Sequence, residues 1–256
     1  MTVYRKHNSF DAIQVQAPAL QDVLTRVRQL EARLESLTLS EEMKAVVTQA
    51  CRELLGTARP RLERSPFHLY PYVMEEISRL TEEELPRYLW YRYRYDTFPS
   101  CKILDRFPPC LQIEPASVCN YRCVFCYQTD GAFTKRTNGH MGTMSLEMFQ
   151  RVIDQAIGSC EAVTLASRGE PLLCPEIESM LAYARGKFLA LKLNTNASLL
   201  DERRSHAILE GGVNTVVFSV DAASEPTYSR LRVGGQLERV LQNIRRFQEI
   251  RARHYP

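Results

Sequence analysis

Residues 189–196 read Leu189-Ala-Leu-Lys-Leu-Asn-Thr-Asn196, an apolar run that ends in carboxamide side chains. The length and composition of this run predict a β-strand. A helical pattern follows from Asp201 to Glu210, and a further apolar run, Thr215-Val-Val-Phe-Ser-Val-Asp221, predicts another strand. Strand and helix therefore alternate in this part of the chain.

The same alternation extends outward in both directions. The runs Leu111-Gln-Ile-Glu114 and Ala162-Val-Thr-Leu-Ala-Ser167 predict strands, and helical patterns cover residues 145–157, 175–185 and 237–251. Four βα units in succession predict a parallel sheet with helices on its outer face, as a barrel or a doubly wound sheet. Such folds place their sites at the carboxyl ends of the strands, where polar residues gather here.

The first hundred residues predict only helices. Apolar residues recur every three or four positions from about Pro18 to Leu39, and Ser40 can cap a second helix that Gly56 would end. A third helical stretch runs from Pro71 to about Tyr91. Within it, Thr81-Glu-Glu-Glu84 fits a capping box that restarts the helix after Leu80.

These patterns predict three parts of the chain. We expect a helical region over residues 1–100, a linker over 101–110, and an α/β core over 111–256. The linker is expected because Phe107-Pro-Pro109 disfavours helix.

One helical segment, Tyr88-Leu-Trp-Tyr-Arg-Tyr-Arg-Tyr95, alternates aromatic rings with guanidinium groups. This combination can stack bases and bind phosphates of single-stranded nucleic acid. It is also typical of an amphipathic segment that packs on protein and keeps its polar tips in water. We favour packing, because no neighbouring basic cluster supports a nucleic-acid groove.

Composition indicates a globular protein. The 256 residues are 45% hydrophobic, and 33 basic against 30 acidic residues leave a net charge of only +3, which does not favour nucleic acid or an anionic membrane as a partner. The N-terminus lacks an apolar signal segment and no stretch predicts a membrane span, so we expect a cytoplasmic protein. The cysteines outside the motif described next lack paired spacing, as expected in a reducing compartment.

Three thiols in the segment Cys119-Asn-Tyr-Arg-Cys123-Val-Phe-Cys126 follow a C-x3-C-x2-C spacing. Three ligands would leave one coordination position open, either on zinc or on one iron of a cubane cluster. His140 lies downstream and could complete a Cys3His zinc site. We favour the cluster, because the spacing near His140 does not resemble a zinc finger.

This motif, with Phe125 before its last cysteine, closely resembles the signature of the radical S-adenosylmethionine (radical SAM) enzymes. The resemblance implies that Cys119, Cys123 and Cys126 hold a 4Fe-4S cluster whose unique iron binds S-adenosylmethionine. Reductive cleavage of that cofactor would give a 5'-deoxyadenosyl radical that abstracts hydrogen from a substrate. Phe125 would pack near the adenine, and the Tyr127 backbone would meet its amino edge.

The strand ends are similar to further motifs of the same family. Ser167-Arg-Gly-Glu-Pro171 resembles its Gly-Gly-Glu-Pro motif, with Arg168 in place of the first glycine. The segments at the ends of the next two predicted strands also resemble family motifs but depart from them, with Ala197 and Ala222 in place of glycine. The resemblance implies that the cofactor is bound by Gly169, Glu170, Asn194, Asn196, Ser219, Asp221 and Arg232. Turn capping is an equally good role for Asn196, and Arg230 is a weaker alternative to Arg232 for binding the methionyl carboxylate.

The family resemblance also predicts the wider setting. It implies a partial (β/α) TIM-like barrel with the first four βα units, most similar to the SPASM or twitch branch and truncated after the fourth unit. We expect a reductant such as flavodoxin or ferredoxin as partner, and a peptide, sugar or small metabolite as substrate. The alternative function is a non-catalytic zinc or Fe-S interaction module.

Two further expectations concern the neighbourhood of the site. Strand parity should turn Lys192 and Glu114 to the same side as Asn194, so that Lys192 neutralises Glu114 or contacts an acidic substrate. The long loop at residues 128–143 is expected to cover the cluster or to be a solvated connection.

Overall fold

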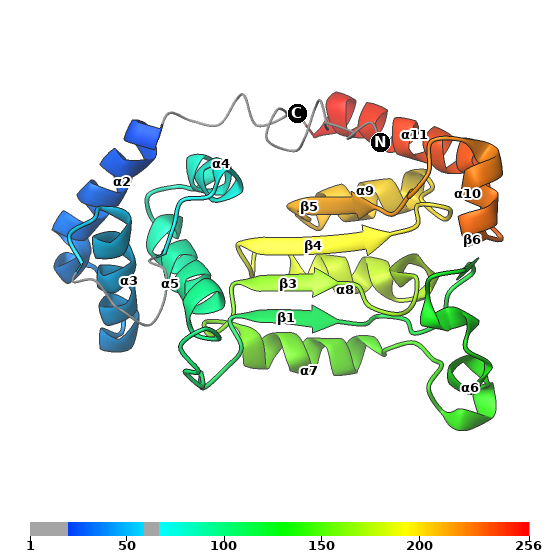
Figure 1. Ribbon diagram of the computed structural model, residues 1–256, viewed down its shortest axis with the longest axis horizontal. Coiled ribbons are helices and arrows are strands. Elements are labelled where there is room, and N and C mark those ends of the chain that lie inside the picture. Colours follow the sequence, from blue (N-terminus) through cyan, green and yellow to red (C-terminus); the bar gives the residue numbers. More distant parts are fainter. Residues whose placement is uncertain (1–19, 59–66, 256) are drawn as a thin grey trace, which may run out of the picture. The chain divides into compact units, whose positions relative to one another are not determined.

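The computed structural model describes residues 20–58 and 67–255, which form two compact units, Met1–Pro109 and Cys110–Pro256. The first is helical and the second is α/β (Figure 1). Each unit is described by itself. The start of the first predicted helix, at Pro18, lies outside the described residues.

Four α-helices make up the described part of the helical unit. They are α2 (Leu20–Arg33), α3 (Glu41–Leu54), α4 (Pro71–Arg79) and α5 (Glu84–Thr97). The first predicted helix ends earlier than Leu39, because α2 stops at Arg33 and a single 3-10 turn, Leu34–Ser36, follows it. Apolar residues spaced by three or four positions, such as Val23, Val27 and Leu30, are fully buried, as an amphipathic helix requires.

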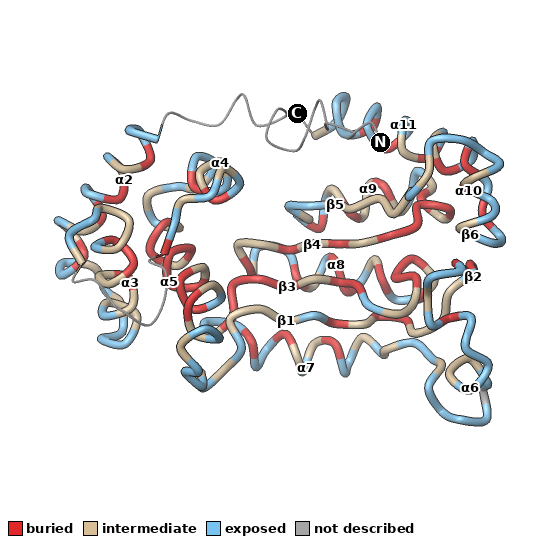
Figure 2. Tube along the Cα trace, in the orientation of Figure 1, coloured by how far each residue is buried: buried red, intermediate tan, exposed pale blue. Residues whose placement is uncertain are grey.

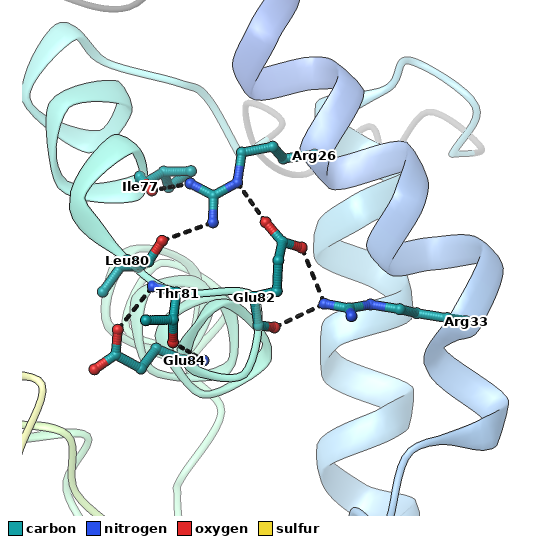
Figure 3. Close-up of polar contacts among 7 residues, drawn as sticks. All are labelled: Arg26, Arg33, Ile77, Leu80, Thr81, Glu82 and Glu84. Atoms are coloured by element: carbon teal, nitrogen blue, oxygen red, sulfur yellow. Dashed lines mark hydrogen bonds and ion pairs between the residues drawn. The ribbon is translucent and has the colours of Figure 1, made fainter.

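Both predicted helix caps are present. The Ser40 hydroxyl accepts a hydrogen bond from the Met43 backbone N–H (3.2 Å) at the start of α3. Before α5, the Thr81 N–H donates to the Glu84 carboxylate (2.8 Å), and the Glu84 N–H donates to the Thr81 hydroxyl (3.3 Å). Figure 3 shows this reciprocal pair beside Glu82, whose carboxylate binds the guanidinium groups of Arg26 and Arg33. The capping box and its acidic neighbour thus fasten the start of α5 to α2.

The aromatic segment of α5 is packed into protein. Tyr88, Trp90, Tyr91 and Tyr93 are all less than a tenth exposed, and so is Arg94. The Tyr93 hydroxyl donates to Glu53 (2.8 Å), and the Arg94 guanidinium pairs with Asp105 (2.6 Å) and lies over the Trp90 ring. Rings and guanidinium groups bound in this way support the packing interpretation.

The α/β unit contains the predicted parallel sheet. Its strands are β1 (Cys110–Ile113), β3 (Ala162–Leu165), β4 (Ala190–Thr195) and β5 (Thr215–Phe218), in the order β1-β3-β4-β5 with every pairing parallel. The helices between and after them are α7 (Leu146–Ala156), α8 (Ile177–Ala184), α9 (Glu202–Glu210) and α11 (Leu237–His254). Neighbouring helices of this series contact one another beside the sheet (Figure 1). The prediction of an α/β fold with four parallel strands is confirmed.

Burial alternates along β4 and separates the two faces of the sheet. Leu191 and Leu193 are buried, whereas Lys192 and Asn194 are partly exposed. Buried residues continue along β3 and on the helices beside the sheet (Figure 2). The apolar face therefore meets the helices, and the face that carries Lys192 and Asn194 is the more open one.

Some elements differ from the sequence-based expectation. The helix α10 (Glu225–Leu231) and a small antiparallel pair, β2 (Arg122–Cys123) with β6 (Arg232–Val233), were not predicted. The last strand was predicted to reach Asp221, but β5 ends at Phe218, and Asp221 has a left-handed backbone with φ of 60°. Strand parity therefore does not govern the direction of the Asp221 side chain. Among the described residues, no helix is long and apolar enough to cross a membrane.

Candidate cofactor site

A pocket at the carboxyl ends of the strands brings together residues from five separate segments. The three motif cysteines line it with parts of the turns after β3 and β4. Of the predicted site residues, ten line this pocket, and only Tyr127 and Asp221 do not. Its full lining is Cys119, Cys123, Phe125, Cys126, Ala166, Ser167, Arg168, Gly169, Glu170, Asn194, Thr195, Asn196, Ser219 and Arg232.

Backbone contacts order the cysteine segment. Cys123 pairs with Arg232 across the β2–β6 ladder, the Cys126 N–H donates to the Cys123 carbonyl (2.9 Å), and the Tyr121 N–H donates to the Cys119 sulfur (3.4 Å). Burial raises the pKa of the Cys119 and Cys123 thiols, while the Arg232 charge opposes the rise at Cys123. A cation that binds thiolates would overcome this cost of burial.

The motif cysteines and His140 have different surroundings. Among the described residues, no three His, Cys, Asp or Glu side chains are grouped to hold a single metal ion. A cubane cluster is bound at separate iron atoms, so its thiolates need not converge on one point. His140, which the disfavoured zinc alternative would use as a fourth ligand, stacks on the Phe133 ring with centroids 5.6 Å apart.

Glu170 is the buried carboxylate of the pocket, with 2% of the residue exposed. Its Oε1 accepts hydrogen bonds from the Leu172 N–H (3.1 Å) and the Thr195 hydroxyl (2.6 Å), and its Oε2 accepts one from the Asn196 N–H (2.7 Å). A carboxylate has about four lone-pair positions, so these contacts leave one on Oε2. Burial raises the Glu170 pKa, against the effect of the three hydrogen bonds. A bound ammonium would satisfy the remaining position and favour the charged form.

Gly169 allows the turn after β3 to lie directly on the segment that leads into the cysteines. A Cβ at this position would lie 1.9 Å from the Ala116 carbonyl oxygen and 2.6 Å from that of Val118. The Glu170 N–H donates to the same Val118 carbonyl (2.9 Å). Close backbone approach therefore requires glycine here and couples the carboxylate to the cysteine segment.

The two asparagines at the carboxyl end of β4, Asn194 within the strand and Asn196 just after it, have different surroundings. Asn196 is buried, and its amide donates to Asn120 within the cysteine motif (3.0 Å) while its Oδ1 accepts from Ser198. Asn194 lines the pocket, and its Oδ1 is buried without a hydrogen-bond partner among the described residues. An unpaired buried acceptor is costly, so Asn194 is suited to a ligand that donates a hydrogen bond.

Arg232 and Asp221 act as a pair. The Arg232 guanidinium donates from Nε (2.6 Å) and from Nη2 to the same Asp221 oxygen, and it lies 5.6 Å above the Phe125 ring. Its Nη1 lies 3.7 Å from the Cys123 sulfur. Arg230, the weaker alternative, is exposed and does not line the pocket. Arg232 thus connects the end of the sheet to the cysteine segment.

The expected pairing of Lys192 with Glu114 is wrong. Lys192 does lie on the same face as Asn194, but the Glu114 carboxylate binds Arg168 through Nη2 (2.7 Å) and Nε (3.2 Å). The backbone N–H of Arg168 donates to Glu114 as well (2.7 Å). Arg168 takes this partner because the turn after β3 brings both its backbone N–H and its guanidinium to the carboxylate that follows β1.

Three residues at the site were missed by sequence reasoning. Thr195 donates to Glu170, Asn120 joins the asparagine network, and Gln128 is buried with its amide donating to the carbonyls of Ser117 (2.7 Å) and Arg168 (2.8 Å). Asn120 and Thr195 stand inside or between motif residues, which was an available signal. Nothing in the sequence marks Gln128 as buried.

Fold and pocket together define a parallel α/β protein whose ligand site is built from thiols and a buried carboxylate at the carboxyl edge of the sheet. A comparison with protein families places the chain further. The model of the radical SAM superfamily matches residues 113–253, more than half of the chain. The chain belongs to the radical SAM superfamily, whose members use a 4Fe-4S cluster and S-adenosylmethionine.

The chain is similar over somewhat more than half of its length to several curated proteins. It is 25% identical over 146 residues to the tungsten-containing aldehyde ferredoxin oxidoreductase cofactor-modifying protein of Pyrococcus furiosus, covering 55% of this chain and 39% of that protein. It is 28% identical over 142 residues to the GTP 3',8-cyclase of Desulforamulus reducens (55% and 42%). It is 29% identical over 151 residues to the dTDP-4-amino-4,6-dideoxy-D-glucose ammonia-lyase of Streptomyces venezuelae (57% and 30%). The chain spans less than half the length of these relatives.

The residues present fit the two cofactors of the family. Three thiols line one pocket, Glu170 keeps a free lone-pair position, and Asn194 offers an unpaired buried acceptor. These donors and acceptors match a cluster with an open iron and an amino-acid ligand bearing an ammonium group. Superfamily membership implies radical chemistry dependent on S-adenosylmethionine, and the alternative of a non-catalytic metal-binding module is not better supported.

Proposed function

We propose that this chain forms the cofactor-binding core of an enzyme that cleaves S-adenosylmethionine reductively and uses the resulting 5'-deoxyadenosyl radical to abstract hydrogen. One observation carries the proposal: the cysteine segment, Glu170, Asn194 and Arg232 line the same pocket. In this proposal the four-stranded sheet is a partial (β/α) barrel, with the pocket at its mouth.

The cysteines would hold the cluster, which supplies the electron for cleavage. Cys119, Cys123 and Cys126 would bind three irons and leave the fourth for the cofactor. The Arg232 guanidinium, 3.7 Å from the Cys123 sulfur, would partly balance the negative charge of the thiolates. Phe125, a residue that is 60% exposed, would cover the pocket beside Arg232 with its ring.

The remaining residues would bind and orient S-adenosylmethionine. Glu170 would accept the ammonium of the methionyl group on Oε2, and Asn194 would accept a hydrogen bond on its unpaired Oδ1. Arg232 uses Nε and Nη2 for Asp221 and one N–H of Nη1 for the Cys123 sulfur, and the second N–H of Nη1 would bind the methionyl carboxylate. Asn196, Ser219 and Asp221 would complete the ribose side of the site. Gly169 would let the turn after β3 lie close to the cysteine segment.

The substrate and the reductant stay proposals. We expect a peptide, a sugar or a small metabolite, and a flavodoxin or ferredoxin as electron donor. The likeness to the SPASM or twitch branch stays a prediction from the sequence.

Anaerobic reconstitution with iron and sulfide tests the proposal. We expect about four irons per chain and formation of 5'-deoxyadenosine from S-adenosylmethionine under a strong reductant. Replacing Cys123 with alanine should remove most of the iron, whereas Cys101→Ala, in the helical unit, should retain it. Glu170→Gln should keep the iron and raise the KM for S-adenosylmethionine about tenfold or more, the loss expected for a charged hydrogen bond of about 1.5–3 kcal/mol. A filled cluster without cleavage product would contradict the proposal.

A further inference from the structure

Arg168 stands where the family motif has a glycine, and it joins the ends of β1 and β3. Its backbone N–H and its guanidinium both bind the Glu114 carboxylate, at 2.7 Å in each case. The two side chains are 38% and 19% exposed. The guanidinium contacts the carboxylate through both Nε and Nη2, which fixes the orientation of its plane.

The other side of the same guanidinium faces the loop that follows the last cysteine. Its central carbon lies 4.6 Å from the centroid of the Phe133 ring, which belongs to the short helix α6 (Gly131–Thr134). The Phe133 ring in turn stacks on His140 (5.6 Å) and meets the edge of Tyr127 (5.7 Å). Arg168 therefore begins a stack of four side chains that spans the loop.

Backbone contacts fix both ends of this loop to the same region. Near its start, the buried Gln128 amide bridges the carbonyls of Ser117 and Arg168. Near its end, the Gly142 N–H donates to the Ser117 hydroxyl (2.8 Å), and the Ser117 N–H donates to the Gly142 carbonyl (2.9 Å). Between these two attachments, the contact of Arg168 with the Phe133 ring connects the exposed middle of the loop to the turn after β3.

We propose that Arg168 is a positioning residue that holds the post-cysteine loop, residues 127–142, against the pocket. A glycine at this position has no side chain to make the contact, so this role belongs to this chain and not to the family motif. The loop starts directly after Cys126, which lines the pocket, so holding the loop also fixes the Tyr127 backbone next to that cysteine. The consequence for S-adenosylmethionine binding rests on the proposed function; the attachment of the loop does not.

Hydrogen exchange on the apoprotein tests the attachment. Arg168→Gln keeps a polar side chain of similar reach but removes the charge, and we expect exchange across residues 127–142 to rise about tenfold while residues 190–195 of β4 are unchanged. Arg203→Gln is the matched control. It removes another arginine–glutamate pair, Arg203 with Glu178 (3.0 Å), and should leave the loop unchanged.

Two further variants separate positioning from general stability. Phe133→Leu removes the ring and leaves the Glu114–Arg168 pair, so it should raise loop exchange as Arg168→Gln does. Arg168→Lys restores a cation and should recover part of the protection. Unchanged loop exchange in both Arg168→Gln and Phe133→Leu, or an equal rise in the loop and β4, would overturn the proposal.

The cofactor consequence has a separate readout. In reconstituted protein, the S-adenosylmethionine concentration that half-converts the EPR signal of the reduced cluster should rise severalfold in Arg168→Gln, at unchanged iron content. An unchanged concentration would overturn this consequence. If the wild-type signal does not respond to S-adenosylmethionine, the proposed function fails, and hydrogen exchange still decides whether Arg168 holds the loop.

Discussion

A Cβ atom at Gly169 would lie 1.9 Å from the carbonyl oxygen of Ala116. Backbone from the turn after β3 thus presses on backbone that leads into the cysteine motif. Neither segment has a flexible side chain there that could move aside. The distance between the Glu170 carboxylate and the cysteine thiols therefore depends on residue 169 having no Cβ atom.

Gly169→Ala should be strongly destabilising. Overpacking against backbone typically costs about 1–3 kcal/mol, and we expect a loss at the upper end of this range in the free energy of unfolding. Denaturant titration of the apoprotein measures it. Gly131→Ala is the control, because no atom lies within 4 Å of its Cβ position and a change below about 0.5 kcal/mol is expected. Similar losses in both variants would refute the steric explanation.

Asn194→Ala should separate stability from binding. The variant removes a buried Oδ1 that has no partner among the described residues, so the apoprotein should be no less stable, and up to about 1 kcal/mol more stable. If Asn194 accepts a hydrogen bond from the cofactor, the KM for S-adenosylmethionine should rise about tenfold. Thermal unfolding and steady-state kinetics give the two values. A destabilised variant with unchanged KM would assign Asn194 a purely structural role.

Cysteine alkylation should report burial. Desolvation, aided by the Glu31 charge, raises the pKa of Cys51 to about 12, and burial raises that of Cys160 to about 11. Because only the thiolate reacts, about one in 10⁴ Cys51 side chains is reactive at pH 8, and this fraction rises tenfold per pH unit. Iodoacetamide at pH 8, followed by mass spectrometry, should leave both unmodified and label the partly exposed Cys101. Equal labelling of Cys51 and Cys101 in folded protein would contradict the expectation.

The raised pKa of Cys51 makes the free energy of unfolding depend on pH. A thiol whose pKa is raised in the folded state stabilises the protein fully below the unfolded pKa of about 9. Above it the unfolded chain releases its proton first. The free energy of unfolding should therefore fall between pH 9 and about 12 because of Cys51.

Thr81→Ala should weaken the helical unit. The variant removes the hydroxyl that accepts from the Glu84 N–H, and loss of an N-cap side chain costs about 1 kcal/mol. Ser78→Ala removes an exposed hydroxyl within α4 and serves as the comparison, with little change expected. Denaturation followed by helical circular dichroism distinguishes them. Equal midpoints for the two variants would show that the capping box carries no net stability.

The sequence predicted the parallel sheet because each strand is a short apolar run between helical patterns. It also predicted most of the pocket, since Glu170, Asn194 and Ser219 lie at or just after the carboxyl ends of successive strands and parallel strands end at one edge. The small β2–β6 pair was beyond such reasoning. Two-residue strands have no periodicity, and their pairing depends on tertiary contacts.

The Glu114 pairing shows a second limit. Strand parity placed Lys192 on the correct face of the sheet. It does not describe the turn after β3, from which Arg168 binds the Glu114 carboxylate. Gln128 is similar, because its buried amide contacts the carbonyls of Ser117 and Arg168, which come from other turns of the chain. Partners that come from turns and loops required the structure.

The ladder between Cys123 and Arg232 joins positions 109 residues apart in the chain. The β2–β6 pair therefore joins the first and the last motif of the pocket. The chain between these two motifs contains every other segment that lines the pocket. A shortened gene ending before this arginine would keep all three cysteines yet leave their segment without its strand partner. Minimal versions for biophysical work should accordingly extend through Gly235 into α11.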